Sequence, residues 1–414
     1  MFSMVRVRGV RRPVVTLAIA AALSGCGEPS SSPPLTWDGD FVLSSTVFTP
    51  DSASSFVRVI EDPGTPAVVN ADDALEVGGA AALFGFDGQR MFALGSSESP
   101  VITRHVVTSD GRLEEDGELS LAGGGSGVAS AFRRPGLVPF VSPTKAYFID
   151  DVTKQVLVWN PTEMTLDGAI SFASADREGL VIEVGERAVV RGEHLFVPVR
   201  YRTVEESDAG IAAALVFEHA TDSFVGVVED DRCGDTVHVV EASDGTLYFG
   251  SGTLGATFYA LQRPAGYPAP CVLRIEPGET EFDPDFYVSI PSLVGDRPAG
   301  RLVAGVDGNA YVLALHTELL EAPLSDETEL YAPWEASAWR WWGIELGATT
   351  PGTQLESTPV ASGAGWALHA GDLQLVTQIR YDEGRTTLLV PQADGSLRAG
   401  LDVAGVPYSI VRLQ

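Results

Sequence analysis

Short apolar runs alternate with Gly, Asp, Asn and Pro along most of the chain, and long helical patterns are missing. Three stretches, 82–94, 237–250 and 302–313, share one arrangement: an apolar run, a tight turn and a second run rich in aromatics. The turns are Asp87-Gly88, Asp244-Gly245 and Asp307-Gly308. Asp-Gly between alternating apolar runs is the strongest short-range hairpin signal. The pattern therefore predicts a β-hairpin that recurs along the chain.

Weaker copies of this hairpin raise the number of repeating units to seven. They lie at 138–148, 188–196 and 366–375, with a first unit near 41–60. A third apolar run follows several hairpins, at 156–159, 214–217, 272–275 and 340–344, and a fourth lies at 286–290. Four strands in each of seven units predict an all-β fold, a β-propeller with seven four-stranded blades. Six or eight blades remain open because the first and last units are degenerate, and a pair of β-sandwiches is the rival fold.

The first residues carry a different pattern, typical of an export signal. Residues 1–12 contain four arginines and no acid, and residues 14–23 are apolar apart from one threonine. This apolar run is about half the roughly 20 residues that a spanning helix needs. Leu23-Ser24-Gly25-Cys26 follows, and it resembles the lipobox of bacterial lipoproteins, in which the cysteine becomes the lipidated first residue.

The resemblance implies three parts for the chain. We expect a lipoprotein signal peptide over 1–25, a lipidated Cys26 with a flexible Pro/Ser tether over 26–35, and a single propeller domain over 36–414. Lipid chains on Cys26 would be the only membrane contact. Gly27 after the cysteine favours the outer membrane among the envelope locations.

The charge balance excludes one class of partner. The chain has 56 Asp and Glu against 27 Lys and Arg, a formal net charge of −29. Such a field repels nucleic acid. Lys145 and Lys154 are the only lysines, so a pocket for anions would have to use arginine, which holds planar anions bidentately.

Two cysteines remain after Cys26 is assigned to lipid. In an exported protein, Cys233 and Cys271 are expected to form a disulfide. Two unpaired buried thiols are the alternative.

A ligand site is expected on one face of the propeller. The strand before each Asp-Gly turn should be innermost, and the loop that leads into it shares a face with the loop between the second and third strands. These loops, together with the start of one innermost strand, hold the candidate residues Arg133, Arg134, Arg187, Tyr201, Arg202, Arg232, His238, Tyr259, Tyr267, Arg301 and Trp334. They predict a rim of arginines and aromatics around the channel mouth, and a Cys233–Cys271 bridge would hold the long aromatic loop over 253–270 beside it. The alternative is that the arginines are solvated and paired with acids.

Motifs for catalysis are weak. The six histidines show no metal-ligand spacing, and Ser126 in a Gly-rich stretch lacks the strand-turn-helix setting of a nucleophile elbow. We therefore expect no cofactor, no metal and no catalysis.

The Trp339–Trp342 run is expected in the core between blades, because alternate residues of a strand face opposite sides of its sheet and must be buried there.

The lipobox, the tether and the repeated units together resemble a family of bacterial propeller lipoproteins that accompany TonB-dependent outer-membrane receptors and include siderophore-capturing proteins. The resemblance implies a membrane-anchored protein that captures a ferric siderophore or another small anionic ligand, with such a receptor as partner. Arginine and aromatic side chains suit an anionic, aromatic chelate. Two other functions remain open: a protein-interaction scaffold in an envelope complex, and a propeller lyase or hydrolase.

Overall fold

The computed structural model describes residues 39–72, 74–85, 89–124, 134–203, 207–371 and 373–413. The expected signal peptide, Cys26 and the tether lie outside these residues, and so does Arg133. Within the described ranges, no helix is both long and apolar enough to cross a membrane.

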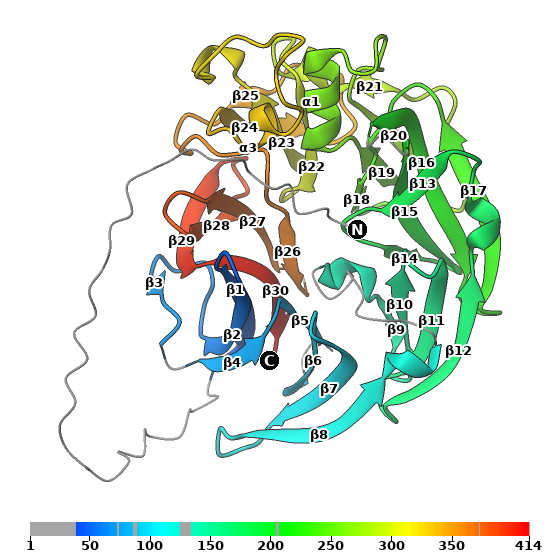
Figure 1. Ribbon diagram of the computed structural model, residues 1–414, viewed down its shortest axis with the longest axis vertical. Helices are drawn as coiled ribbons and strands as arrows, with labels where there is room; N and C mark the ends of the chain where they lie inside the picture. Colours follow the sequence, from blue (N-terminus) through cyan, green and yellow to red (C-terminus); the bar gives the residue numbers. More distant parts are fainter. Residues whose placement is uncertain are drawn as a thin grey trace.

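Seven sheets surround a central axis, which confirms the predicted seven-bladed β-propeller (Figure 1). Blades two and three contain β5 (Ala81–Gly85), β6 (Met91–Ser96), β7 (Ser99–Val107), β8 (Leu113–Ser120), β9 (Phe140–Ser142), β10 (Lys145–Asp150), β11 (Gln155–Asn160) and β12 (Thr165–Ser171). Blade four contains β13 (Leu180–Val184), β14 (Val189–Arg191), β15 (His194–Thr203), β16 (Asp208–Glu218) and β17 (Ser223–Asp230). Blades five and six contain β18 (His238–Glu241), β19 (Leu247–Gly250), β20 (Cys271–Ile275), β21 (Val288–Ser289), β22 (Ala299–Ala304), β23 (Asn309–Leu315), β24 (Trp339–Glu345) and β25 (Thr353–Gln354). Blade seven contains β26 (Ala367–Ala370), β27 (Leu373–Arg380), β28 (Arg385–Pro391) and β29 (Leu397–Ala404).

Blade one joins the two ends of the chain. Its outer strands are β1 (Phe41–Phe48), β2 (Ala53–Ile60) and β4 (Leu75–Gly78), and its innermost strand is β30 (Val406–Arg412), which pairs with β1. The short strand β3 (Val68–Val69) pairs in parallel with β29 and adds to the edge of blade seven. The expected first unit near 41–60 is therefore only the middle of a blade, because the C-terminal strand completes it.

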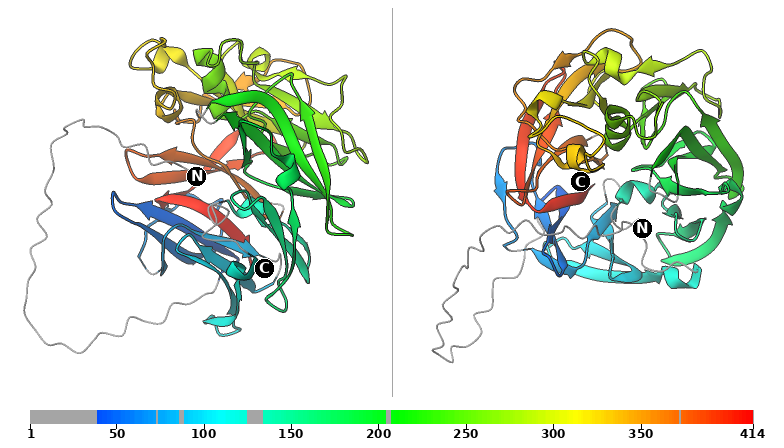
Figure 2. Two further views of the ribbon diagram at one scale, coloured as in Figure 1. Left: turned by 45° about the vertical axis from the view of Figure 1, so that its right-hand side comes forward. Right: turned by 45° about the horizontal axis from the view of Figure 1, so that its top comes forward.

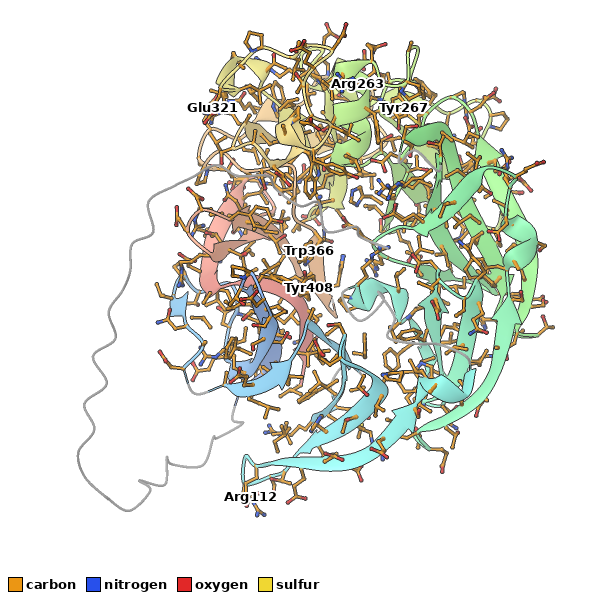
Figure 3. All side chains as sticks on the ribbon, viewed as in Figure 1. Arg112, Arg263, Tyr267, Glu321, Trp366 and Tyr408 are labelled. Atoms are coloured by element: carbon orange, nitrogen blue, oxygen red, sulfur yellow. A yellow bond between two sulfur atoms is a disulfide. The ribbon has the colours of Figure 1, made fainter. Side chains whose placement is uncertain are left out.

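An aromatic pair lies at this closure. Trp366, just before β26, stacks on Tyr408 in β30 with ring centroids 4.9 Å apart and planes 13° apart (Figure 3). The Trp366 indole also donates a hydrogen bond of 2.8 Å to the carbonyl oxygen of Pro407. The innermost strands of blades seven and one are thus joined by side chains where the ring closes.

Apolar side chains fill the spaces between neighbouring blades, because alternate residues of a strand face opposite sides of its sheet. Trp339 and Trp341 are fully buried with Val376 and Leu389 of blade seven, whereas Trp342 packs on the opposite face of β24. Fully burying an aliphatic side chain such as Val376 or Leu389 stabilises a fold by roughly 1.5–3 kcal/mol. The tryptophan run therefore forms inter-blade core, as predicted.

Helices are short and lie in loops: α1 (Thr253–Leu261), α2 (Ile290–Leu293), α3 (Ala332–Glu335), and the 3-10 turns η1 (Leu121–Gly124), η3 (Pro135–Leu137), η4 (Ala173–Ala175) and η5 (Thr317–Leu319). Helix α1 follows β19 and α3 precedes β24, so both lie in loops between second and third strands. They contact each other at one edge of the ring (Figure 2).

A disulfide joins Cys233 to Cys271 as predicted, with Cα atoms 5.8 Å apart. It links the loop that leads into β18 to the first residue of β20. The loop that carries α1 is therefore held at its end to the beginning of its own blade.

Candidate functional site

A buried network of charges lies where blades four and five meet; we call it the Arg200 network. The Arg200 guanidinium, on β15, donates hydrogen bonds of 2.8 Å and 3.1 Å to Glu183 and one of 2.6 Å to Asp235. Arg202 binds the same Glu183 oxygen at 3.0 Å, and Arg134 lies 3.9 Å from the other oxygen. Burial raises the pKa of Glu183, but Arg200 and Arg134 outweigh it and lower this pKa to about 2.

The fully buried Asp235 is satisfied on its other side as well. Its second carboxylate oxygen accepts a hydrogen bond of 2.5 Å from the backbone NH of Gly255 near the start of α1. A Cβ on Gly255 would lie 2.6 Å from the Asp235 Cβ, so only glycine permits this approach. The network therefore ties α1 to β13 and β15, and its charges hold the fold together.

One carboxylate of this region is incompletely satisfied. Asp208 Oδ1 accepts hydrogen bonds from the Tyr267 hydroxyl at 2.9 Å and the Gly210 NH at 2.7 Å, whereas its Oδ2 is buried without a partner among the described residues. Burial and the charge of Asp235 raise the pKa of Asp208 to about 7.

A second group of charges lies at the propeller axis and begins at Glu186 and Arg187. These residues interrupt the innermost strand of blade four, between β13 and β14. The Glu186 NH donates to the Val237 carbonyl of blade five at 3.1 Å. Gly185 permits this contact between blades, because a Cβ there would lie 2.4 Å from the same carbonyl oxygen.

The side chains of Glu186 and Arg187 meet residues from three other blades. Arg187 Nη1 lies 3.3 Å and 3.4 Å from the two ring nitrogens of His369 on β26. Because blades four and seven are not neighbours, this contact crosses the axis. Glu186 lies 3.5 Å from Arg301 Nη1 on β22 and 3.5 Å from His238 Nδ1 on β18. We call Glu186, Arg187, His238, Arg301 and His369 the axial cluster.

Arg301 is held by the backbone of the neighbouring blade. Its guanidinium donates to the carbonyl oxygens of Gly363, at 3.1 Å, and Gly365. Its backbone φ is +64°, at an irregular position of β22. Strained backbone in a non-glycine residue clusters at functional sites.

The axial cluster leaves polar atoms without partners. Within the described part of the chain, His238 Nε2 and Arg301 Nε are buried and make no hydrogen bond. Arg187 makes no ion pair with a described carboxylate. Its only hydrogen-bonding contact there is the His369 ring. Arg187 is half-buried, and burial lowers its pKa, while Glu241 opposes this shift without forming an ion pair with it. A partly desolvated guanidinium without a direct carboxylate partner retains hydrogen-bonding capacity.

The two histidines are neutral at neutral pH. Burial and the charge of Arg301 lower the pKa of His238 to about 3. Burial and the nearby Arg187 lower the pKa of His369 well below its usual value. The cluster thus combines two guanidinium cations with one carboxylate, Glu186, whose pKa is raised by burial.

The predicted arginines among the described residues, His238 and Trp334 separate into four places. Arg187, His238 and Arg301 meet in the axial cluster, whereas Arg134 and Arg202 belong to the Arg200 network. Arg232 pairs with Asp230 and lines a cavity of about 700 Å³ between blades four and five. Trp334 lines a different cavity over blade six. The expected single rim of arginines and aromatics is therefore not assembled.

The predicted tyrosines do not reach the axial cluster. Tyr201 is buried in the core, with its hydroxyl 3.2 Å from the Ala175 carbonyl, because it lies inside β15 rather than in a loop. Tyr267 is buried against Phe258 and Asp208. Tyr259 is half-buried on α1. Arg301 and Arg187 likewise lie in or between innermost strands, not in the loops before them.

Sequence reasoning missed Glu186 and His369 as members of the site. His369 is a single polar residue within a short apolar strand, and Glu186 lies between two strands beside Arg187. The contact between Arg187 and His369 joins positions 182 residues apart. The one usable signal is polarity at the innermost strand of a blade, since that strand should otherwise be apolar. Among the described residues, no three His, Cys, Asp or Glu side chains gather so as to hold a metal ion.

Fold and site together define a seven-bladed β-propeller with a polar cluster at its axis. No protein-family model matches the sequence, and a comparison with curated proteins finds no match. Among solved structures, a hypothetical selenium-binding protein from Sulfolobus tokodaii is similar with 9% identity and a TM-score of 0.52, covering 92% of this chain and 94% of that chain. A putative 6-phosphogluconolactonase from Bacteroides fragilis is similar with 10% identity and a TM-score of 0.51, covering 92% and 100%. At such identities the likeness shows the fold alone.

Proposed function

We propose that this chain is an envelope lipoprotein whose propeller binds a small, carboxylate-rich anion at the axial cluster. The observation that carries the proposal is Arg187, a half-buried guanidinium whose only polar partner among the described residues is a neutral imidazole. A carboxylate would form charge-assisted hydrogen bonds with it, which are worth about 1.5–3 kcal/mol. Arg301 supplies a second cation close by, through Glu186.

The resemblance to siderophore-capturing lipoproteins narrows the ligand class. A ferric chelate whose ligands are carboxylates has oxygen acceptors that suit the arginines and histidines of the axial cluster. A chelate built from aromatic rings would need stacking partners, and the predicted tyrosines are buried or lie elsewhere. Carboxylate-type ferric siderophores are therefore the first ligands to test.

A panel of anions tests this proposal. The purified protein would be titrated with ferric citrate, iron-free citrate, a catecholate ferric siderophore and a neutral sugar, and quenching of its seven tryptophans would be followed. We expect saturable binding of the citrates and none of the sugar. Absence of binding by every anion would overturn the proposal, and stable capture of envelope proteins instead would favour the scaffold.

The lipid anchor has its own test. Cys26→Ser removes the sulfur that the lipobox resemblance assigns to lipid, and without two or more acyl chains membrane binding is marginal. We expect the wild-type protein in the membrane fraction of its host and the variant in the soluble fraction. Equal partition of the two proteins would contradict the anchor.

A further inference from the structure

A second cavity, besides the one that Arg232 lines, lies over blades six and seven, and its charged lining residues are acids. Its volume is about 1230 Å³. The lining comes from the long segment between β23 and β24, residues 319–337, and from Tyr381 in the turn between β27 and β28. Both segments connect second to third strands, so the cavity is on the same face as α1.

Hydrogen bonds join the 319–337 segment, which forms the wall of this cavity, to the loop that carries α1. The Arg263 guanidinium, beyond α1, donates hydrogen bonds to the carbonyl oxygens of Thr328, at 2.7 Å, Ser325, at 3.2 Å, and Asp326. Figure 3 shows Arg263 and Glu321 at the same edge of the molecule. These bonds hold the segment in one conformation, which makes the cavity largely pre-formed.

Trp334 is fixed in the same way. Its indole NH donates to the Thr253 hydroxyl at 3.1 Å, and its carbonyl accepts from the Gly363 NH at 2.7 Å. Tyr331 lies edge-on to its ring, with centroids 6.5 Å apart. An aromatic face at the cavity is therefore positioned before any ligand arrives.

The lining has one sign of charge. Apolar contacts come from Leu319, Leu320 and Leu324, and the aromatics are Trp334 and Tyr381. The charged residues that line it are Glu321, Glu329 and Glu335, and no lining residue in the described ranges is Lys, Arg or His. The nearby cations are already engaged: Arg263 and Arg301 bind backbone carbonyl oxygens, and Arg297 pairs with Glu318 at 2.9 Å.

We propose that this cavity binds an organic cation with an apolar body, such as a substituted ammonium. Aromatic faces attract ammonium groups, and the leucines would contact the apolar part of the ligand. The three carboxylates supply the complementary field and exclude anions. The cavity adjoins the axial cluster, since Gly363 binds both the Trp334 carbonyl and the Arg301 guanidinium, but it is lined by other residues and has the opposite sign of charge. This proposal therefore does not rest on the proposed function.

Benzyltrimethylammonium is a suitable probe because its charge does not depend on pH. Calorimetric titration of the full protein at low salt should show saturable binding of this cation and none of benzoate. Replacing Glu321, Glu329 and Glu335 by Gln together should weaken binding about tenfold or more. Tyr381→Ala should weaken it by a smaller factor, because Tyr381 is an exposed wall residue whose loss leaves the fold intact.

A matched control keeps the test decisive. Glu356→Gln removes an exposed acid outside the cavity, so this variant should bind the probe as the wild-type protein does. No saturable binding by a folded wild-type protein would overturn the proposal. Equal affinity in the triple variant, or equal binding of benzoate, would overturn it as well.

Discussion

The Arg200 network and the axial cluster use the same residue types on neighbouring blades, and they differ in how fully their charges are paired. In the Arg200 network, one guanidinium meets Glu183 and the fully buried Asp235 at distances of 2.6–3.1 Å. In the axial cluster, the only hydrogen-bonding contact of the Arg187 side chain among the described residues is His369, and the side-chain contacts of Glu186 are 3.5 Å long. The first arrangement satisfies its buried charges, whereas the second leaves hydrogen-bonding capacity that we propose a ligand uses.

The largest expected loss of stability comes from a substitution in the Arg200 network. Arg200→Met leaves Asp235 and Glu183 buried without their strongest partner, and breaking a buried pair in this way costs about 3–5 kcal/mol. Denaturant unfolding would measure the loss. Arg112→Met, at an exposed arginine far from both regions (Figure 3), should change stability by less than about 0.5 kcal/mol. A loss below 1 kcal/mol for Arg200→Met would contradict the structural role.

A pH-dependent effect comes next and concerns Asp208, which borders the Arg200 network. Burial and the charge of Asp235 raise its pKa to about 7 in the folded protein, above that of an aspartate in an unfolded chain, so the folded state binds more protons than the unfolded state between about pH 4 and pH 7. Stability therefore falls as pH rises through this window.

The variant Asp208→Asn isolates this contribution. From pH 5 to pH 8, the wild-type protein should lose about 2–3 kcal/mol relative to the variant. The free energy of unfolding at the two pH values gives the comparison directly. Parallel pH profiles would show that Asp208 titrates normally.

The smallest effect on stability should be at the unpaired guanidinium. Arg187→Gln keeps a donor toward His369 and removes a partly desolvated charge, so the free energy of unfolding should change by less than about 1 kcal/mol. The same denaturation experiment measures it beside Arg200→Met. A loss of unfolding free energy as large as that of Arg200→Met would mean that Arg187 mainly stabilises the fold.

The recurrent Asp-Gly hairpins predicted the fold, because turn chemistry and strand alternation are local properties. The closure by β30 escaped prediction since its partner β1 lies at the other end of the chain. Arg187, His238 and Arg301 were predicted as site residues from their place near innermost strands. His369 and Glu186 were not, because contacts across the axis leave no local pattern, and Tyr201 was misplaced because β15 extends further than its apolar run indicates.

Citrate binding to Arg187→Gln, beside Arg112→Gln and the wild-type protein, tests the central claim most directly. Calorimetry at one pH and salt concentration would give the three dissociation constants. The account predicts that Arg187→Gln weakens binding about ten- to hundredfold while Arg112→Gln leaves it unchanged. Equal affinity in all three folded proteins would contradict an anion site at the axial cluster.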